Sequence, residues 1–110
     1  MRILVLTETD ACCGPMAAAF LRDYSISNEV VSAGHNPIDS IDPLVVTVMK
    51  ECIIDLSTYV PKNARLVDVS EFDVVYQCPE RLCPKAIDAY RELRDFIKNE
   101  AYLFFRKMNL

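Results

Sequence analysis

The sequence predicts an α/β fold built on a small parallel sheet, and three observations carry this prediction. Short apolar runs of strand length alternate along the chain with amphipathic stretches of helical length. The first run, residues 2–7, leads through a compact polar loop into a helix that starts at Pro15. The chain has 110 residues, of which 52% are hydrophobic, so it is long enough for a genuine core. We therefore predict a single domain over residues 1–110.

The middle of the chain continues the same alternation. A second strand is predicted over residues 29–32 and is closed by Gly34. Asp42 and Pro43 then open a helix, because an acidic cap followed by proline is a helix start signal. The apolar positions of this helix recur at helical spacing and are Val45, Met49, Cys52 and Ile53. Residues 57–72 give no clear pattern beyond a short helical turn near residues 65–69.

The last third of the chain predicts one strand and one long helix. Residues 72–78 are apolar enough for a third buried strand. The final helix is expected to begin at Lys85 or Ala86. Its apolar positions form one long stripe, made of Ile87, Tyr90, Leu93, Ile97, Ala101, Phe104 and Met108.

The loop between the first strand and the first helix is the most informative segment. It consists of Thr7, Glu8, Thr9, Asp10, Ala11, Cys12, Cys13 and Gly14, followed by Pro15, Met16 and Ala17. A strand, a tight loop and a helix N-terminus together form the usual cradle for an oxyanion. This segment resembles the active-site loop of the low-molecular-weight tyrosine phosphatases and thioredoxin-coupled arsenate reductases. Their pattern is cysteine, five residues, arginine, then serine-proline-methionine-alanine.

Further landmarks of that family follow in the same order along the chain. They are Val31 to Gly34, Asp42-Pro43, Ile54 to Ser57 with Pro61-Lys62, Phe72 to Cys78, and Tyr90 to Asp95. The resemblance implies a small doubly wound parallel sheet of order 2-1-3 with helices on both faces. The family usually adds a fourth strand and a loop that carries the general acid. Here only Pro84 to Ala89 separates Cys83 from the final helix, so we expect both to be missing, with Asp88 in the helix's first turn.

The resemblance also locates the family's reactive positions in this chain. Aligned on Pro15, the nucleophilic cysteine falls on Thr7 and the oxyanion-binding arginine falls on Cys13. A threonine hydroxyl is far less acidic than a thiol, and no histidine base accompanies it in the sequence. The only histidine, His35, follows the second strand and is expected in a solvated loop. No catalytic residue is therefore predicted.

Anion binding by the loop is doubtful on the same grounds. The family has glycine where this chain has Thr9, and converging backbone N–H groups need a turn that glycine permits. Glu8 and Asp10 place carboxylates where a phosphate would sit, so the pocket is expected to be neutral to acidic. The alternative is that both are exposed loop residues, with Asp10 capping the helix.

The remaining cysteines permit three interpretations. By resemblance to the arsenate reductases, Cys78 and Cys83 match the pair of thiols that relays a disulfide, and Cys12 matches a loop cysteine. Loops after the first and third strands meet at one edge of the sheet, where the thiols should converge. In the first interpretation the cysteines are inert small hydrophobic residues. In the second, Cys78 and Cys83 form a reversible disulfide. In the third, the cysteines bind a metal ion. The candidates for that metal site are Cys12, Cys13, Cys78 and Cys83.

The leading functional hypothesis is a degenerate homologue that acts as a binding or regulatory module without phosphatase or arsenate reductase activity. The first alternative is a thiol-based redox or metal-binding protein that uses Cys12, Cys13, Cys78 and Cys83. The second alternative is retained family activity. No cofactor is predicted, and the question of an enzyme is left open with absence of activity favoured.

Charge and the end of the chain bear on partners. A net charge of -4 argues against nucleic acid or an anionic membrane as partner. Five cysteines and the absence of a leader or a spanning apolar run favour a reducing cytoplasm. Leu103, Phe105 and Leu110 fall off the apolar stripe of the final helix. They either cover the sheet edge without a fourth strand, or form a patch for self-association or an unknown protein partner.

Overall fold

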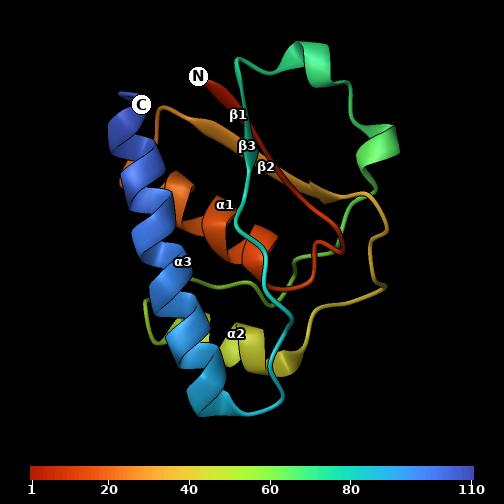
Figure 1. Ribbon diagram of the computed structural model, residues 1–110, viewed down its shortest axis with the longest axis vertical. Helices are drawn as coiled ribbons and strands as arrows, with labels where there is room; N and C mark the ends of the chain where they lie inside the picture. Colours follow the sequence, from red (N-terminus) through yellow and green to blue (C-terminus); the bar gives the residue numbers. More distant parts are fainter.

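The computed structural model describes all residues from 1 to 110, and its elements alternate as the sequence predicts (Figure 1). In chain order they are β1 (Arg2–Thr7), α1 (Cys13–Tyr24), β2 (Glu29–Gly34), α2 (Pro43–Lys50), the 3-10 turns η1 (Ala64–Leu66) and η2 (Val69–Glu71), β3 (Val74–Gln77) and α3 (Ile87–Lys107). The sheet has three strands in the order β2-β1-β3. The predicted fold class and strand order are confirmed, and no fourth strand follows β3.

The register of the sheet brings the three strand ends to one edge. Both neighbours of β1 are parallel to it, and Thr7 at its end pairs with Gly34 of β2. The loops that leave β1, β2 and β3 therefore start side by side. This carboxyl edge is where a parallel sheet places its functional groups.

Alternating residues of β1 contribute to two cores. Ile3 and Val5 face the larger core, which they share with residues of all three α-helices. In that core α1 and α3 lie side by side, as Figure 1 shows, and Ile97 is fully buried. Leu4 and Leu6 face the other way and are covered by the segment that carries η1 and η2. Helical segments thus cover both faces, but on the second face they are only short 3-10 turns.

The start of α2 agrees with the sequence prediction, but its end does not. Asp42 accepts the N–H of Leu44 at 2.9 Å and Pro43 occupies the first turn, as expected for a helix start. The helix ends at Lys50, earlier than the apolar spacing predicts. Ile53 adopts a positive φ of 61° and is 96% exposed, so its place on the buried stripe was predicted wrongly. The turn redirects the chain, and Cys52 stays half-buried against the core.

The C-terminal part of α3 packs onto the core along one side only, and Met108, predicted on the apolar stripe, is 40% exposed. Phe105 contacts the ring of Tyr24 with centroids 5.5 Å apart, and Leu110 is also packed against the core cluster. Leu103 is 54% exposed, so of the three residues off the stripe it alone faces solvent. None of the helices combines the length and the apolar character needed to cross a bilayer.

Candidate functional site

The loop from Thr7 to Gly14 lies at the carboxyl edge of the sheet, between β1 and α1. Its members from Asp10 onward are buried, as is Thr7, whereas Glu8 is exposed and Thr9 is half-buried. Gly34 at the end of β2 lies so close that a β-carbon there would be 2.8 Å from the Asp10 backbone nitrogen. The loop is therefore clamped against β2 and is not a free surface turn.

Thr7 is used to hold the loop together. Its side chain is almost fully buried, at 5% exposure, and its Oγ1 accepts the backbone N–H of Asp10 at 3.1 Å. His35 donates its backbone N–H to the Thr7 carbonyl at 3.1 Å, but its imidazole makes no hydrogen bond to this hydroxyl. Thr7, on which the resemblance places the family's nucleophile, is thus a structural hydrogen-bond acceptor.

Asp10 is the centre of a buried polar network. Its Oδ2 accepts hydrogen bonds from the Tyr59 hydroxyl and, at 2.9 Å, from the Lys62 backbone N–H. The Tyr59 hydroxyl also shares a hydrogen bond with the hydroxyl of Ser32 on β2. The network joins the β1–α1 loop to β2 and to the segment before η1.

The environment of Asp10 favours its neutral form. The side chain is 0% exposed, and desolvation by burial raises its pKa, although bonds from Tyr59 and Lys62 oppose this shift. Burial, together with the hydrogen bond to Asp10, likewise raises the pKa of Tyr59. Both groups are therefore arranged as a hydrogen-bonded pair that resists ionisation.

One interpretation of this part of the loop was wrong. Asp10 does not cap α1, because the cap position is Cys12 and no side chain bonds there. Asp10 has left-handed backbone, with φ of 50°. Aspartate tolerates this conformation better than most residues, so the turn forms without the family's glycine.

One oxygen of this network has no partner. Asp10 Oδ1 is buried and accepts no hydrogen bond. It faces Gly14, where a β-carbon would lie 3.1 Å from it and 2.9 Å from Thr7 Oγ1. Gly14 has no side chain that could donate a hydrogen bond to this oxygen.

Cys13, at the family's arginine position, is buried and bonded to the backbone after β3. Its thiol donates to the carbonyl of Arg81 at 3.7 Å, and the N–H of Arg81 donates back to the sulfur at 3.5 Å. Burial raises the pKa of the Cys13 thiol, so the thiolate is disfavoured. The side chain of Arg81 does not replace the missing guanidinium, because it lies over the Phe96 ring at 3.8 Å.

The predicted convergence of the four thiols is found, with a different pairing. A disulfide joins Cys12 to Cys83, whose α-carbons are 6.1 Å apart, and Cys78 is free. Cys78 ends β3 pointing inward, where its thiol donates to the Cys13 carbonyl at 3.7 Å. The sulfur of Cys13 lies 4.0 Å from that of Cys12. The Cys78–Cys83 disulfide considered from the sequence does not form here, because β3 buries Cys78 while residues 79–83 carry Cys83 across the helix N-terminus.

The thiol metal site considered from the sequence is not assembled in this structure. The sulfurs of Cys12 and Cys83 are bonded to each other, and burial strongly raises the pKa of Cys78. No group of three or more histidine, cysteine, aspartate and glutamate side chains is placed to hold a metal ion.

The carboxylate that bonds to the start of the loop belongs to Glu80, which the sequence analysis did not predict. The backbone N–H of Glu8, the first donor after β1, points between both carboxylate oxygens of Glu80, each 3.0 Å away. The acids expected there lie elsewhere, since the Glu8 side chain bonds to Asn36 and Asp10 turns inward. Thr9, Ala11 and Cys12 offer backbone N–H groups that no acceptor in the chain engages. The loop thus keeps donors of the anion-binding kind, with a carboxylate of the chain on the first of them.

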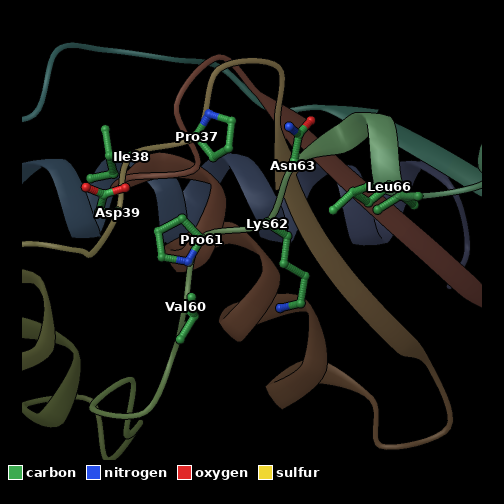
Figure 2. Close-up of a pocket in the computed structure, with 9 residues that line it drawn as sticks. Pro37, Ile38, Asp39, Val60, Pro61, Lys62, Asn63 and Leu66 are labelled. Atoms are coloured by element: carbon green, nitrogen blue, oxygen red, sulfur yellow. The ribbon is translucent and has the colours of Figure 1, made fainter.

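Two hollows lie beside this edge. The larger, of about 530 Å³, opens between the loop of Pro37 and Ile38 and the segment of Val60, Pro61 and Leu66 (Figure 2). It does not reach the β1–α1 loop. A second hollow of about 380 Å³ does, because Ala11 and Cys83 both line it together with Tyr90.

Three residues of this site are not predicted from the sequence. Tyr59 lies in the stretch without a clear pattern, and Glu80 and Arg81 lie between Cys78 and Cys83. Lys62 belongs to a landmark of the resemblance, but its hydrogen bond to Asp10 is not predicted. The position of Glu80 and Arg81 directly after a predicted strand was the available signal, because loops at the carboxyl edge meet there.

The sequence model of the family "Low molecular weight phosphotyrosine protein phosphatase" matches residues 2–106. The chain belongs to this family. No curated protein matches the sequence.

Solved structures of the low-molecular-weight phosphatase family and its arsenate reductase relatives share the fold along nearly the whole chain. A low molecular weight protein tyrosine phosphatase from T. tengcongensis superposes with a TM-score of 0.83 at 19% identity, covering 97% of this chain and 99% of that one. An arsenate reductase in the phosphate binding state gives 0.82 at 18% identity, with 96% and 97% covered. The YwlE arginine phosphatase from Geobacillus stearothermophilus gives 0.75 at 18% identity, with 98% and 92% covered. At such identities the likeness concerns the fold, and activity has to be argued from the residues.

Proposed function

We propose that this member of the low-molecular-weight phosphatase family is catalytically inactive and acts as a binding or regulatory module. The observation that carries the proposal is the state of Thr7, whose hydroxyl occupies the nucleophile's position and is tied to the Asp10 backbone. Cysteine-dependent phosphoryl transfer requires a thiolate in line with phosphorus, and a buried threonine hydroxyl without a base does not supply one.

The second missing part is the cation of the loop. A guanidinium at the position of Cys13 would bind equatorial oxygens of an anion in a bidentate manner. The thiol there is neutral at physiological pH, because burial raises the pKa of Cys13. The general acid has no counterpart either, since the chain passes from β3 to α3 without a fourth strand or its loop.

Turnover measurements test this proposal directly. Purified reduced protein is assayed with p-nitrophenyl phosphate, and separately with arsenate plus a dithiol reducing system. We expect rates equal to those of the matched variants Thr7→Val and Cys13→Ser. A rate that is above background and is lost in either variant would instead establish retained family activity, and the proposal would be abandoned.

A thiol-based redox role is the alternative, and the Cys12–Cys83 disulfide favours it. The free thiol of Cys13 lies 4.0 Å from the Cys12 sulfur, close to the distance needed for exchange after a small movement. Equilibration in glutathione buffers followed by peptide mapping tests this role. A single Cys12–Cys83 bond that forms and breaks over a physiological range of buffer ratios supports it. Mixed or unchanging pairings count against it.

The partner of the module is proposed to be a protein bound at the end of α3, or a second copy of the chain. Leu103 is the most exposed of the large hydrophobic residues there, beside Tyr102 and Met108, whereas Phe105 and Leu110 pack against the core. Sedimentation velocity at high concentration tests self-association. A concentration-dependent dimer that Leu103→Lys abolishes supports the second copy, and a strictly monomeric protein rules it out.

A further inference from the structure

Residues Pro79 to Cys83, which we call the strap, connect the end of β3 to the approach to α3 without regular secondary structure. The strap touches the β1–α1 loop at three points. The Glu80 carboxylate accepts the Glu8 N–H, the Arg81 backbone bonds to the Cys13 thiol, and Cys83 is covalently bound to Cys12. In Figure 1 the segment after β3 runs across the N-terminal end of α1 before it reaches α3.

The contact of Glu80 is unusual for a surface glutamate. No ion pair of the molecule includes its carboxylate, and the neighbouring cation, Arg81, is stacked on Phe96. Its only hydrogen-bond donor is the first backbone N–H after β1. In a loop whose N–H groups converge, that position is one where an anionic ligand would bind. The Glu80 carboxylate therefore bonds to this N–H in the way that an anionic ligand would.

The strap is held mainly by its covalent bond. Glu80, Arg81, Leu82 and Cys83 are all exposed, and Leu82 is 96% exposed, so little apolar burial fixes the segment. The two bonds between Arg81 and Cys13 involve sulfur and are long, at 3.5 and 3.7 Å. Without the disulfide, one charge-assisted hydrogen bond, the stacking of Arg81 on Phe96 and these weak contacts would have to outweigh the entropy of a five-residue free segment.

We propose that the strap is a redox-controlled internal ligand: with Cys12 and Cys83 joined, the Glu80 carboxylate blocks the loop, and reduction releases it. The reductant is a dithiol. One of its thiolates attacks one sulfur of the disulfide and forms a mixed disulfide, which releases the other cysteine. Its second thiolate then attacks the dithiol's own sulfur in that mixed disulfide and releases the remaining cysteine. The dithiol leaves as its own disulfide, while two electrons and two protons end on Cys12 and Cys83 as thiols.

Release would change what the loop presents to solvent. The Glu8 N–H loses its internal acceptor and joins the free N–H groups of Thr9, Ala11 and Cys12. The hollow of about 380 Å³ also opens, because Cys83 and Pro84 form one of its walls opposite Ala11. The idea that the strap controls binding at this loop rests on the proposed function. Whether the strap is bound or released is measured without any turnover assay.

Amide exchange of the full ¹⁵N-labelled chain tests the strap. Oxidised protein, with Cys12–Cys83 verified by peptide mapping, is compared with protein reduced by dithiothreitol. We expect hydrogen exchange at the Glu8 amide to accelerate by about tenfold or more on reduction, since a hydrogen bond to a charged acceptor is lost. Cys83→Ser should exchange at the reduced rate under both conditions, while Cys52→Ser should keep the difference seen for the wild type.

A second pair of variants isolates the carboxylate. In the oxidised state Glu80→Ala should expose the Glu8 amide as reduction does, and Glu92→Gln, a change of an exposed acid on α3, should leave it protected. Equal protection of Glu8 in oxidised and reduced protein would overturn the redox control. Undiminished protection in oxidised Glu80→Ala would overturn the role of the carboxylate. Either result would leave the turnover test of the proposed function untouched.

Discussion

The α-carbon of Gly34 lies against the backbone of Asp10, so that a β-carbon on Gly34 would come within 2.8 Å of the Asp10 nitrogen. The same atom would lie 2.9 Å from the carbonyl carbon of Thr9 and 3.0 Å from the oxygen of Glu8. The end of β2 and the start of the β1–α1 loop are thus in direct backbone contact. Such contact leaves no flexible side chain that could move aside.

Gly34→Ala is therefore expected to destabilise the protein by about 2 kcal/mol, as overpacking against a rigid backbone does. The midpoint of urea unfolding at constant m-value measures this change. Ser27→Ala, in the exposed turn before β2, serves as control and should stay within about 0.5 kcal/mol of the wild type. A Gly34→Ala protein as stable as the control would mean that the loop can retreat from β2.

Asp10→Asn is expected to stabilise the protein at neutral pH by about 1 kcal/mol, the contribution of one satisfied buried hydrogen bond. An amide keeps the bonds from Tyr59 and Lys62 through its oxygen, and its N–H₂ group takes the place of the unpaired Oδ1 beside Thr7.

The pH dependence distinguishes this explanation from a change in packing. The pKa of Asp10 is raised in the folded state above its ordinary value of 3.8. The wild type therefore loses stability as the pH rises from that value through the folded-state pKa, while the variant does not. Urea unfolding from pH 3 to pH 7 should show the advantage of Asp10→Asn growing with pH. An advantage independent of pH would contradict the assignment of burial as its cause.

Tyr59→Phe should destabilise the protein by about 1–3 kcal/mol, because it removes the half-buried hydroxyl that donates to the buried Asp10 and bonds to Ser32. Tyr102→Phe is the matched control, since its hydroxyl only accepts from Arg106 at the surface of α3. Thermal unfolding of both variants provides the comparison. Equal losses in the two would show that the network around Asp10 contributes no special stability.

Glu51→Gln should lower the melting temperature at neutral pH, because Glu51 joins the end of α2 to Arg91 and Arg94 of α3. Hydrogen bonds from Arg91 and Arg94 lower the pKa of Glu51 to about 2. A lowered folded-state pKa means that this stabilisation is present above the ordinary value of 4.5 and is lost as the pH falls toward 2. The two melting curves should therefore converge in acid, and also in high salt, which screens exposed pairs.

The sequence predicts the framework of this protein because the framework follows from local patterns. Apolar strands, the proline at the start of α1 and the short passage from Cys83 to Ala89 together indicate three strands without a fourth. Residue identity alone also places Thr7 and Cys13 at the ends of the loop. Periodicity and spacing are properties of neighbouring residues, so one sequence suffices to read them.

The polar network and the strap could not be predicted in this way. Tyr59 reaches Asp10 across 49 residues, and Glu80 reaches Glu8 across 72. Such contacts depend on how loops leave the sheet edge, and no local periodicity encodes them. The pairing of Cys12 with Cys83 was missed for the same reason, since it is set by the inward turn of Cys78 at the end of β3.

The Cys12–Cys83 bond also makes a large covalent ring. Its two cysteines are separated by 71 residues, so α1, β2, α2 and β3 all lie within a closed ring of chain. Closing a ring of this size removes entropy from the unfolded ensemble worth about 4 kcal/mol in the chain-entropy account. The folded lifetime of the protein would then differ between oxidised and reduced surroundings, so that its abundance, and not only its loop, reports the thiol balance around it.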